Sequence, residues 1–64
     1  MPIGWLPIAS APEAQDLRLS VVDKGEIHAL VFPCRRRGPD WIDALTGRRV
    51  NVNPTHWQLW PANT

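Results

Sequence analysis

Apolar and polar residues alternate along several short runs of this chain, and turn residues separate the runs. Residues 17–21 (Leu-Arg-Leu-Ser-Val) alternate with a period of two, and an apolar, β-branched run over residues 27–32 follows Asp23-Lys24-Gly25. Alternation of this kind is typical of β-strands, and a short polar loop with glycine between two such runs indicates a hairpin. The pattern therefore predicts a first hairpin over residues 17–32.

Two registers of this hairpin agree with the pattern. A three-residue loop with Gly25 in the left-handed conformation aligns Leu17, Leu19 and Val21 with Val31, Ala29 and Ile27. A two-residue turn of Lys24 and Gly25 aligns them instead with Phe32, Leu30 and His28. Because side chains alternate between the faces of a strand, this shift of one residue decides whether His28 faces the core. We expect the three-residue loop, since lysine tolerates positive φ poorly at the first position of the tighter turn.

A second hairpin and a final strand are expected in the other half of the chain. Pro33 ends the first hairpin, and residues 35–40 (Arg-Arg-Arg-Gly-Pro-Asp) are predicted to form a polar loop. Residues 41–44 and 48–52 then flank the turn Leu45-Thr46-Gly47, in a register that sets Ile42 opposite Val50 and Asp43 opposite Arg49. After Asn53-Pro54, residues 56–60 form the last short strand.

The opening of the chain predicts an extended arm. Pro7 and Pro12 disfavour helix over residues 5–12 and favour an extended path. Ser10 followed by Pro12 and Glu13 has the residues of a helix start, but no apolar stripe follows. We therefore expect at most one helical turn, around residues 12–16.

Four tryptophans in 64 residues are the main resource for a core. A chain of this size buries little surface, and the single cysteine excludes an internal disulfide. We expect Trp5, Trp41, Trp57 and Trp60 to nucleate one core, because large aromatic rings left in water favour aggregation. The predicted core residues are Trp5, Leu17, Leu19, Val21, Ile27, Ala29, Val31, Ile42, Val50, Trp57 and Leu59, with Trp41 closing the other face.

Charge is divided unevenly although the formal net charge is only +1. The first 34 residues carry an excess of acidic side chains. The remaining residues contain five arginines and only two acidic residues, Asp40 and Asp43. Arginine and tryptophan dominate the energetics of protein interfaces, and arginines beside an aromatic ring also suit nucleic acids. The candidate binding residues for a protein or nucleic-acid partner are Arg35, Arg36, Arg37, Arg48, Arg49 and Trp60.

No constellation for catalysis, metal binding or cofactor binding is evident. Cys34 is the candidate nucleophile and His28 and His56 are the only imidazoles, but no spacing links them. A lone cysteine at a strand end usually packs as a small apolar side chain. Structural zinc sites usually have paired ligands such as Cys-x-x-Cys, which this sequence lacks. We expect no catalytic residue, no metal and no cofactor. The opening has neither a basic segment nor a long apolar run, so we expect a cytoplasmic protein that does not enter the membrane.

Three segments carry a resemblance to other proteins. They are Trp5-Leu6-Pro7-Ile8 with Ser10-Ala11-Pro12, residues 25–34 (Gly-Glu-Ile-His-Ala-Leu-Val-Phe-Pro-Cys), and Pro54-Thr55-His56-Trp57. The chain resembles a group of short uncharacterised alphaproteobacterial proteins and is more loosely similar to domain-of-unknown-function family 551 of phage and bacterial proteins. The resemblance spans nearly the whole chain and implies a compact β domain, with no activity and no catalytic residues to carry over.

Taken together, the sequence predicts one small mainly β domain over residues 1–64. We expect an antiparallel meander of about four to five strands, with a partly open SH3-like barrel as one version, and an extended N-terminal arm. The expected function is a non-catalytic protein-binding or accessory module, with self-association as one form of it. The alternative is a weak nucleic-acid-binding protein that uses the basic segments Arg35–Arg37 and Arg48–Arg49.

Overall fold

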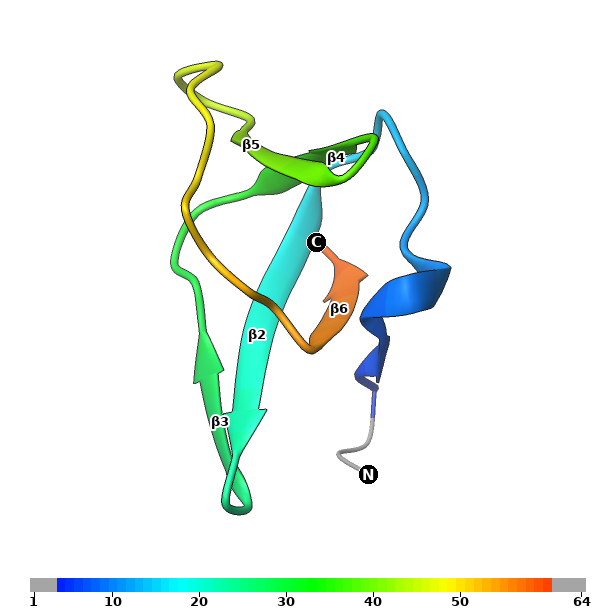
Figure 1. Ribbon diagram of the computed structural model, residues 1–64, viewed down its shortest axis with the longest axis vertical. Helices are drawn as coiled ribbons and strands as arrows, with labels where there is room; N and C mark the ends of the chain where they lie inside the picture. Colours follow the sequence, from blue (N-terminus) through cyan, green and yellow to red (C-terminus); the bar gives the residue numbers. More distant parts are fainter. Residues whose placement is uncertain (1–3, 61–64) are drawn as a thin grey trace.

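A computed structural model describes residues 4–60 of the chain as a mainly β structure (Figure 1). Its strands are β1 (Leu6–Pro7), β2 (Leu17–Asp23), β3 (Glu26–Ala29), β4 (Cys34–Arg37), β5 (Asp40–Asp43) and β6 (His56–Leu59). The one helical segment of this part of the chain is a short 3-10 helix, η1 (Ile8–Ser10). The mainly β prediction is confirmed. The single helical turn was expected around residues 12–16, and this position was wrong, because the turn lies at Ile8–Ser10.

Strand β2 is the centre of one antiparallel sheet with the order β1-β6-β2-β4-β5. β6 pairs with one edge of β2, while β3 and β4 pair with the other edge, at opposite ends of β2. Among residues 4–60 the sheet has six strands, against the four to five expected, and it stays open between β1 and β5. The order departs from a simple meander because the chain crosses over β2 before it forms β6 (Figure 1).

The register of the first hairpin is the two-residue one, so our preference for a three-residue loop was wrong. Val21 lies opposite His28 and Asp23 opposite Glu26. Lys24 and Gly25 have φ values of 52° and 80°, the two positive values that a type I′ turn needs. Its twist matches that of the flanking strands, and this match outweighs the strain on the lysine backbone.

The shift of one residue exchanges the side chains that reach the core. Leu30 N–H donates to Leu19 C=O over 2.9 Å, so Leu30 lies opposite Leu19. Leu30 and Phe32 consequently pack against the core, whereas Ile27 (43% exposed), Ala29 and Val31 (89% exposed) face solvent. These three predicted core residues are wrong for one physical reason, the register. His28 lies on the same face of the sheet as Leu19, but past the end of the core, and it is exposed.

The core is small and lies over the first half of β2. Its buried members are Ala11, Leu17, Leu19, Cys34 and Trp57, and the partly buried residues packed against them are Ile8, Leu30, Phe32, Trp41, Val50 and Val52. The segment between β5 and β6 crosses the face of β2 in Figure 1, and brings Val50 and Val52 over this core. Leu59, the last residue of β6 and another predicted core residue, is 60% exposed, so this prediction was also wrong.

The four tryptophans do not form a single core. Trp57 is 8% exposed and belongs to the core, and Trp41 packs against it. Trp5 and Trp60 are half-buried outside this cluster. The Trp60 ring lies under Arg18, whose guanidinium carbon is 5.3 Å from the ring centroid. The prediction that all four rings meet was therefore wrong, since Trp60 stacks with a cation at the margin of the sheet.

The predicted polar loop at residues 35–40 is in fact a β-hairpin. Arg37 pairs with Asp40 across a turn of Gly38 and Pro39. Gly38 has φ of 56°, and the proline ring fixes the φ of the next residue near −65°, about as a type II′ hairpin turn requires. The turn predicted at residues 45–47 is present, but a single bridge, between Ile42 and Arg49, follows it instead of a strand over 48–52.

This bridge also shifts the predicted pairs of the second hairpin by one residue. Ile42 lies opposite Arg49 rather than Val50, and Val50 N–H donates to Trp41 C=O over 2.7 Å. The carboxylate of Asp43 does not pair with Arg49, because its Oδ1 accepts the N–H groups of Leu45 (2.8 Å) and Thr46 (3.3 Å) in the turn. Capping of the turn therefore takes the place of the expected ion pair.

The N-terminal arm is extended at β1, turns at η1 within the segment predicted to be extended, and is fixed to the last strand. Leu6 pairs with Trp57 in the sheet, and the indole Nε1–H of Trp57 donates to Pro7 C=O (3.1 Å) and to Ser10 Oγ (3.0 Å). Ser10 Oγ–H in turn donates to Pro7 C=O over 2.7 Å. The indole N–H of Trp57 on β6 thus finds its hydrogen-bond acceptors in the N-terminal arm.

Candidate functional site

The three consecutive arginines lie within strand β4, so their side chains alternate between the two faces of the sheet. Arg35 lies opposite Ile42 and Arg37 opposite Asp40, and directly opposite residues of an antiparallel pair share a face. Arg35 and Arg37 are exposed. The sheet therefore brings Arg35 and Arg37 to one face, which is turned to solvent.

Arg36 points to the other face and holds the structure together. It lies opposite Trp41, its Nη1 donates to Ala11 C=O over 2.9 Å, and its Nε donates to Gly38 C=O over 3.2 Å. The side chain is half-buried. Because the guanidinium is committed to two backbone carbonyls, Arg36 ties the N-terminal arm to the β4–β5 turn rather than to a ligand.

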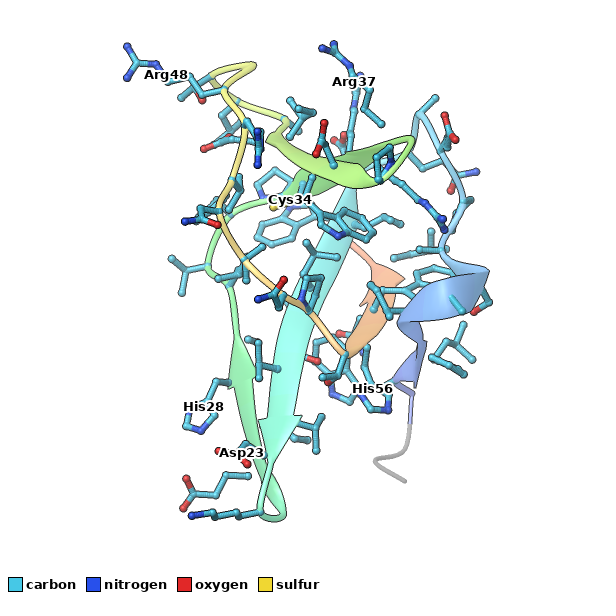
Figure 2. The ribbon with its side chains drawn as sticks, viewed as in Figure 1. Asp23, His28, Cys34, Arg37, Arg48 and His56 are labelled. Atoms are coloured by element: carbon cyan, nitrogen blue, oxygen red, sulfur yellow. The ribbon has the colours of Figure 1, made fainter. Side chains whose placement is uncertain are left out.

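Arg49 extends the exposed face of β4 and β5, and Arg48 precedes it at the same end of the molecule (Figure 2). The bridge to Ile42 places Arg49 beside that strand, where its Nε lies 3.8 Å from Asp40 Oδ1. Arg48 uses its backbone in the turn, since its C=O accepts from Asp43 N–H and its N–H donates to Thr46 Oγ1. Its side chain projects away from the body at the same end of the molecule as that of Arg37 (Figure 2).

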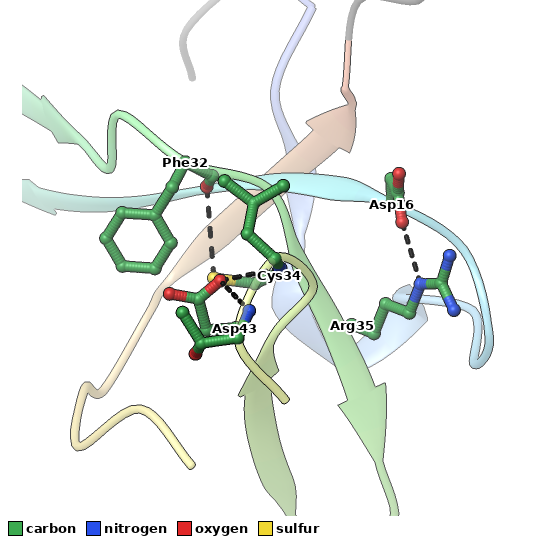
Figure 3. Close-up of polar contacts among 7 residues, drawn as sticks. Asp16, Phe32, Cys34, Arg35 and Asp43 are labelled. Carbon is green, nitrogen blue, oxygen red and sulfur yellow. Dashed lines mark hydrogen bonds and ion pairs between the residues drawn. The ribbon is translucent and has the colours of Figure 1, made fainter. Parts of the chain in front are cut away.

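We call Arg35, Arg37, Arg48 and Arg49 the arginine surface. Acidic residues neutralise part of it: Arg35 Nε donates to Asp16 Oδ1 over 2.7 Å (Figure 3), and Arg49 has the longer contact with Asp40. Among residues 4–60, Arg37 and Arg48 form no ion pair. Exposed ion pairs contribute little to stability, so these acidic residues mainly set the charge pattern of the face.

Trp60, the predicted aromatic member, joins the arginine surface at its margin. The backbone N–H of Trp60 donates to the C=O of Asp16 over 3.1 Å, and the carboxylate of Asp16 accepts from Arg35. Arg18 covers the Trp60 ring. The linear pattern did not show the contacts of Asp16, Arg18 and Asp40, because it does not reveal which charges meet across strands.

A hollow of about 390 Å³ lies beside the arginine surface. It is lined by Glu13, Ala14, Arg35, Arg36, Arg37, Ile42, Asp43, Ala44 and Gly47. Ala14 has φ of 63°, a left-handed conformation that is uncommon for a residue with a Cβ atom. The lining of the hollow combines the apolar side chain of Ile42 with charged side chains of both signs, three arginines and the acidic Glu13 and Asp43.

Cys34 has the environment of a core residue. It is fully buried, its Sγ lies 4.0 Å from Phe32 C=O, and burial, with the nearby charge of Asp43, raises its pKa from 9.0 to about 11. His28 projects from β3 and His56 from β6, away from Cys34 (Figure 2). Nδ1 of His56 is 2.8 Å from Thr55 Oγ1. Neither imidazole is placed to take the proton of this thiol.

We expect Cys34 to react very slowly with a thiol reagent in the folded protein. A pKa higher by about two units leaves about a hundredfold less thiolate at neutral pH, and burial restricts access further. Labelling followed by mass spectrometry measures the rate, with the protein in denaturant as the control that restores ordinary thiol reactivity. Labelling of the native protein as fast as that of the denatured protein would contradict a buried, protonated thiol.

Other kinds of site are not formed by the described residues. Between residues 4 and 60, no group of three or more His, Cys, Asp and Glu side chains is gathered in a way that could hold a metal ion. No helix in the same part of the chain is long and apolar enough to cross a membrane.

Fold and surface together define a small mainly β protein whose most distinctive exposed feature is the arginine surface. The chain matches no protein-family model, no curated protein and no solved structure. The resemblance to domain-of-unknown-function family 551 and to the short alphaproteobacterial proteins therefore stays a prediction from the sequence.

Proposed function

We propose that this chain is a non-catalytic binding module that holds an acidic segment of another protein on the arginine surface. The observation that carries the proposal is the placement of Arg35, Arg37 and Arg49 on one exposed face around Ile42, with Arg48 extending the same end. Arginines that flank an apolar side chain form the kind of patch that contributes most to protein interfaces. Arg37 and Arg48 supply the charges that are not already paired within residues 4–60.

The positions of Trp41 and Trp60 favour a protein over a nucleic acid as the partner. Binding of single-stranded nucleic acid needs open aromatic faces on which bases stack. Trp41 packs against the core on the side opposite to Arg35 and Arg37, and Arg18 occupies one face of the Trp60 ring. Asp16 and Asp40 also interrupt the positive charge along which a phosphate backbone would lie.

Charge reversal at Arg37 tests the proposal with a defined probe. We expect wild-type protein to bind a fluorescent polyglutamate peptide at low salt, and Arg37→Glu to weaken this binding about tenfold, because an attractive charge becomes repulsive. Lys24→Glu is the matched control, since it makes the same change of charge at the exposed turn of the first hairpin. It should alter the dissociation constant much less.

The same titration with a thymidine oligonucleotide of equal charge separates the two partner classes. Tighter binding of the oligonucleotide, with a steep dependence on salt, would support the nucleic-acid alternative instead. Equal loss of peptide binding in Arg37→Glu and Lys24→Glu would show that net charge, and not the arginine surface, governs the contact.

A further inference from the structure

Strand β3 has a free edge. It pairs with β2 on one side, and among residues 4–60 no strand pairs with its other side. All four of its residues, Glu26–Ala29, are exposed, and β3 lies at the margin of the molecule in Figure 1. Native proteins commonly protect such an edge with a short strand, charged side chains, proline or a bulge, and β3 is short and carries the charge of Glu26 but has no proline, lysine or bulge. The edge is therefore open to another strand.

The hydrogen-bonding pattern of the hairpin shows which groups this edge presents. Leu30 N–H donates to Leu19 C=O, so residues 19 and 30 are a hydrogen-bonded pair. Hydrogen-bonded and non-hydrogen-bonded pairs alternate in an antiparallel ladder, so His28 and Glu26 also bond to β2. Ile27 and Ala29 are the non-bonded positions, and their N–H and C=O groups point outward.

The bonds of β2 to its other neighbour agree with this assignment. Val22, the partner of Ile27, donates its N–H to Thr55 Oγ1 over 2.9 Å, and Ser20, the partner of Ala29, accepts from Thr55 N–H over 2.8 Å. Both groups point away from β3. The outward groups of Ile27 and Ala29 are thus left for an external strand.

We propose that two copies of this chain pair through the free edges of β3 to form one continuous antiparallel sheet. In a two-fold arrangement Ile27 of each copy lies opposite Ala29 of the other, and all the outward N–H and C=O groups of both strands find a partner. His28 then lies opposite His28 of the second copy, next to the two-fold axis. The proposal is independent of the arginine surface, which lies at the other end of β2.

Self-complementarity is the reason for choosing a second copy as the occupant. The pairing places the exposed side chain of Ile27 against Ala29 of the other copy twice, which covers apolar surface on the face shared with Val22. The acidic Glu26 falls opposite position 30 of the other copy, so the two like charges do not meet. Glu26 Oε1 also lies 3.5 Å from Nε2 of His28 in its own chain, which keeps a carboxylate beside each central imidazole.

The small size of the core is a further reason to expect association of two copies. Within residues 4–60 the buried core cluster has only five members, and domains of this size are commonly strengthened by association. A contact along one four-residue strand is small, so it belongs to the dissociable class of interfaces. We expect a monomer–dimer equilibrium that depends on protein concentration.

Disulfide trapping tests both the dimer and its register. His28→Cys places two thiols across a non-hydrogen-bonded pair, where Cα atoms are about 4.5 Å apart and a disulfide can close. We expect this variant to form a covalent dimer on mild oxidation, while Lys24→Cys, at the exposed turn of the same hairpin and far from the axis, stays largely monomeric. The native Cys34 is buried and does not compete. Equal cross-linking of the two variants would overturn the proposed register.

Sedimentation equilibrium from micromolar to millimolar concentration tests the association without a cross-link. We expect Ile27→Lys to raise the dissociation constant of the dimer about tenfold or more, because a charge then lies in the paired edge. Leu45→Lys is the control, since Leu45 is also exposed and apolar but lies in the turn after β5. A wild-type protein that stays monomeric throughout, or equal effects of the two lysines, would overturn the proposal. Circular dichroism checks that both variants fold, and if Ile27→Lys does not, the disulfide experiment decides.

Discussion

Replacement of Trp57 by alanine is expected to lower the free energy of unfolding by about 3–5 kcal/mol, the usual cost of removing a large buried aromatic side chain. Trp57 is 8% exposed and stands in β6 between Leu6 of β1 and Leu19 of β2. Its indole N–H also bonds to Pro7 and Ser10, so the substitution releases the N-terminal arm as well.

The loss is large relative to the stability available. A chain of 64 residues has roughly 3–10 kcal/mol of stability in all, so Trp57→Ala is expected to be largely unfolded or close to it. Urea titration followed by circular dichroism measures the change. Trp57→Phe keeps most of the ring but not the indole N–H, and it should fall between the wild type and the alanine variant.

Leu59 provides the matched control in the same strand. Two residues further along β6 it is 60% exposed, and Leu59→Ala should cost less than about 1 kcal/mol. Similar losses for Trp57→Ala and Leu59→Ala would mean that β6 is not held by the indole, and that the two ends of the chain are joined in some other way.

The sequence was sufficient to predict strands where local signals agreed with one another. The alternation over residues 17–21, the turn signal Asp23-Lys24-Gly25 and the run after Pro54 predicted β2, the first hairpin and β6, all of which are present. Prolines predicted the extended arm for the same reason, since they restrict the backbone whatever surrounds them. These features depend on the local chain alone.

The register could not be predicted because two local terms opposed each other. Positive φ is unfavourable for Lys24, yet the two-residue turn gives the twist that the paired strands need. The two-residue register also packs Leu30 and Phe32 against the core in place of Ala29 and Val31. The larger apolar surface of leucine and phenylalanine favours it, and that contribution is visible only once β6 and the crossing segment are in place.

Strand β4 was missed because three identical residues carry no alternation. The three arginines have different surroundings although they are the same residue type. Arg35 forms an ion pair with Asp16, Arg36 donates to two backbone carbonyls, and Arg37 is exposed to solvent. Pairing with β5 makes this segment a strand, and such tertiary context commonly overrides local propensity. The candidate arginines were therefore predicted as a group, while the division between structural Arg36 and the arginine surface required the sheet.

Replacement of Leu19 by alanine is the second large effect expected, a loss of about 2–5 kcal/mol in the free energy of unfolding. Leu19 is fully buried at the centre of β2, between Trp57 on β6 and Leu30 on the other side. Val31→Ala is the informative comparison. Val31 is 89% exposed in the observed register, whereas the three-residue loop would place it in the core opposite Leu17.

We expect Val31→Ala to change stability by less than about 0.5 kcal/mol, as for other exposed substitutions. Urea midpoints of the two variants, measured side by side with unchanged slopes, give the comparison directly. A cost for Val31→Ala that approaches the cost for Leu19→Ala would mean that the hairpin adopts the other register in solution. Ile27 and Ala29 would then turn toward the core and bond to β2, and the outward backbone groups of the β3 edge would be those of Glu26 and His28. The same result would therefore exclude the pairing of Ile27 with Ala29 through which we propose that two copies join.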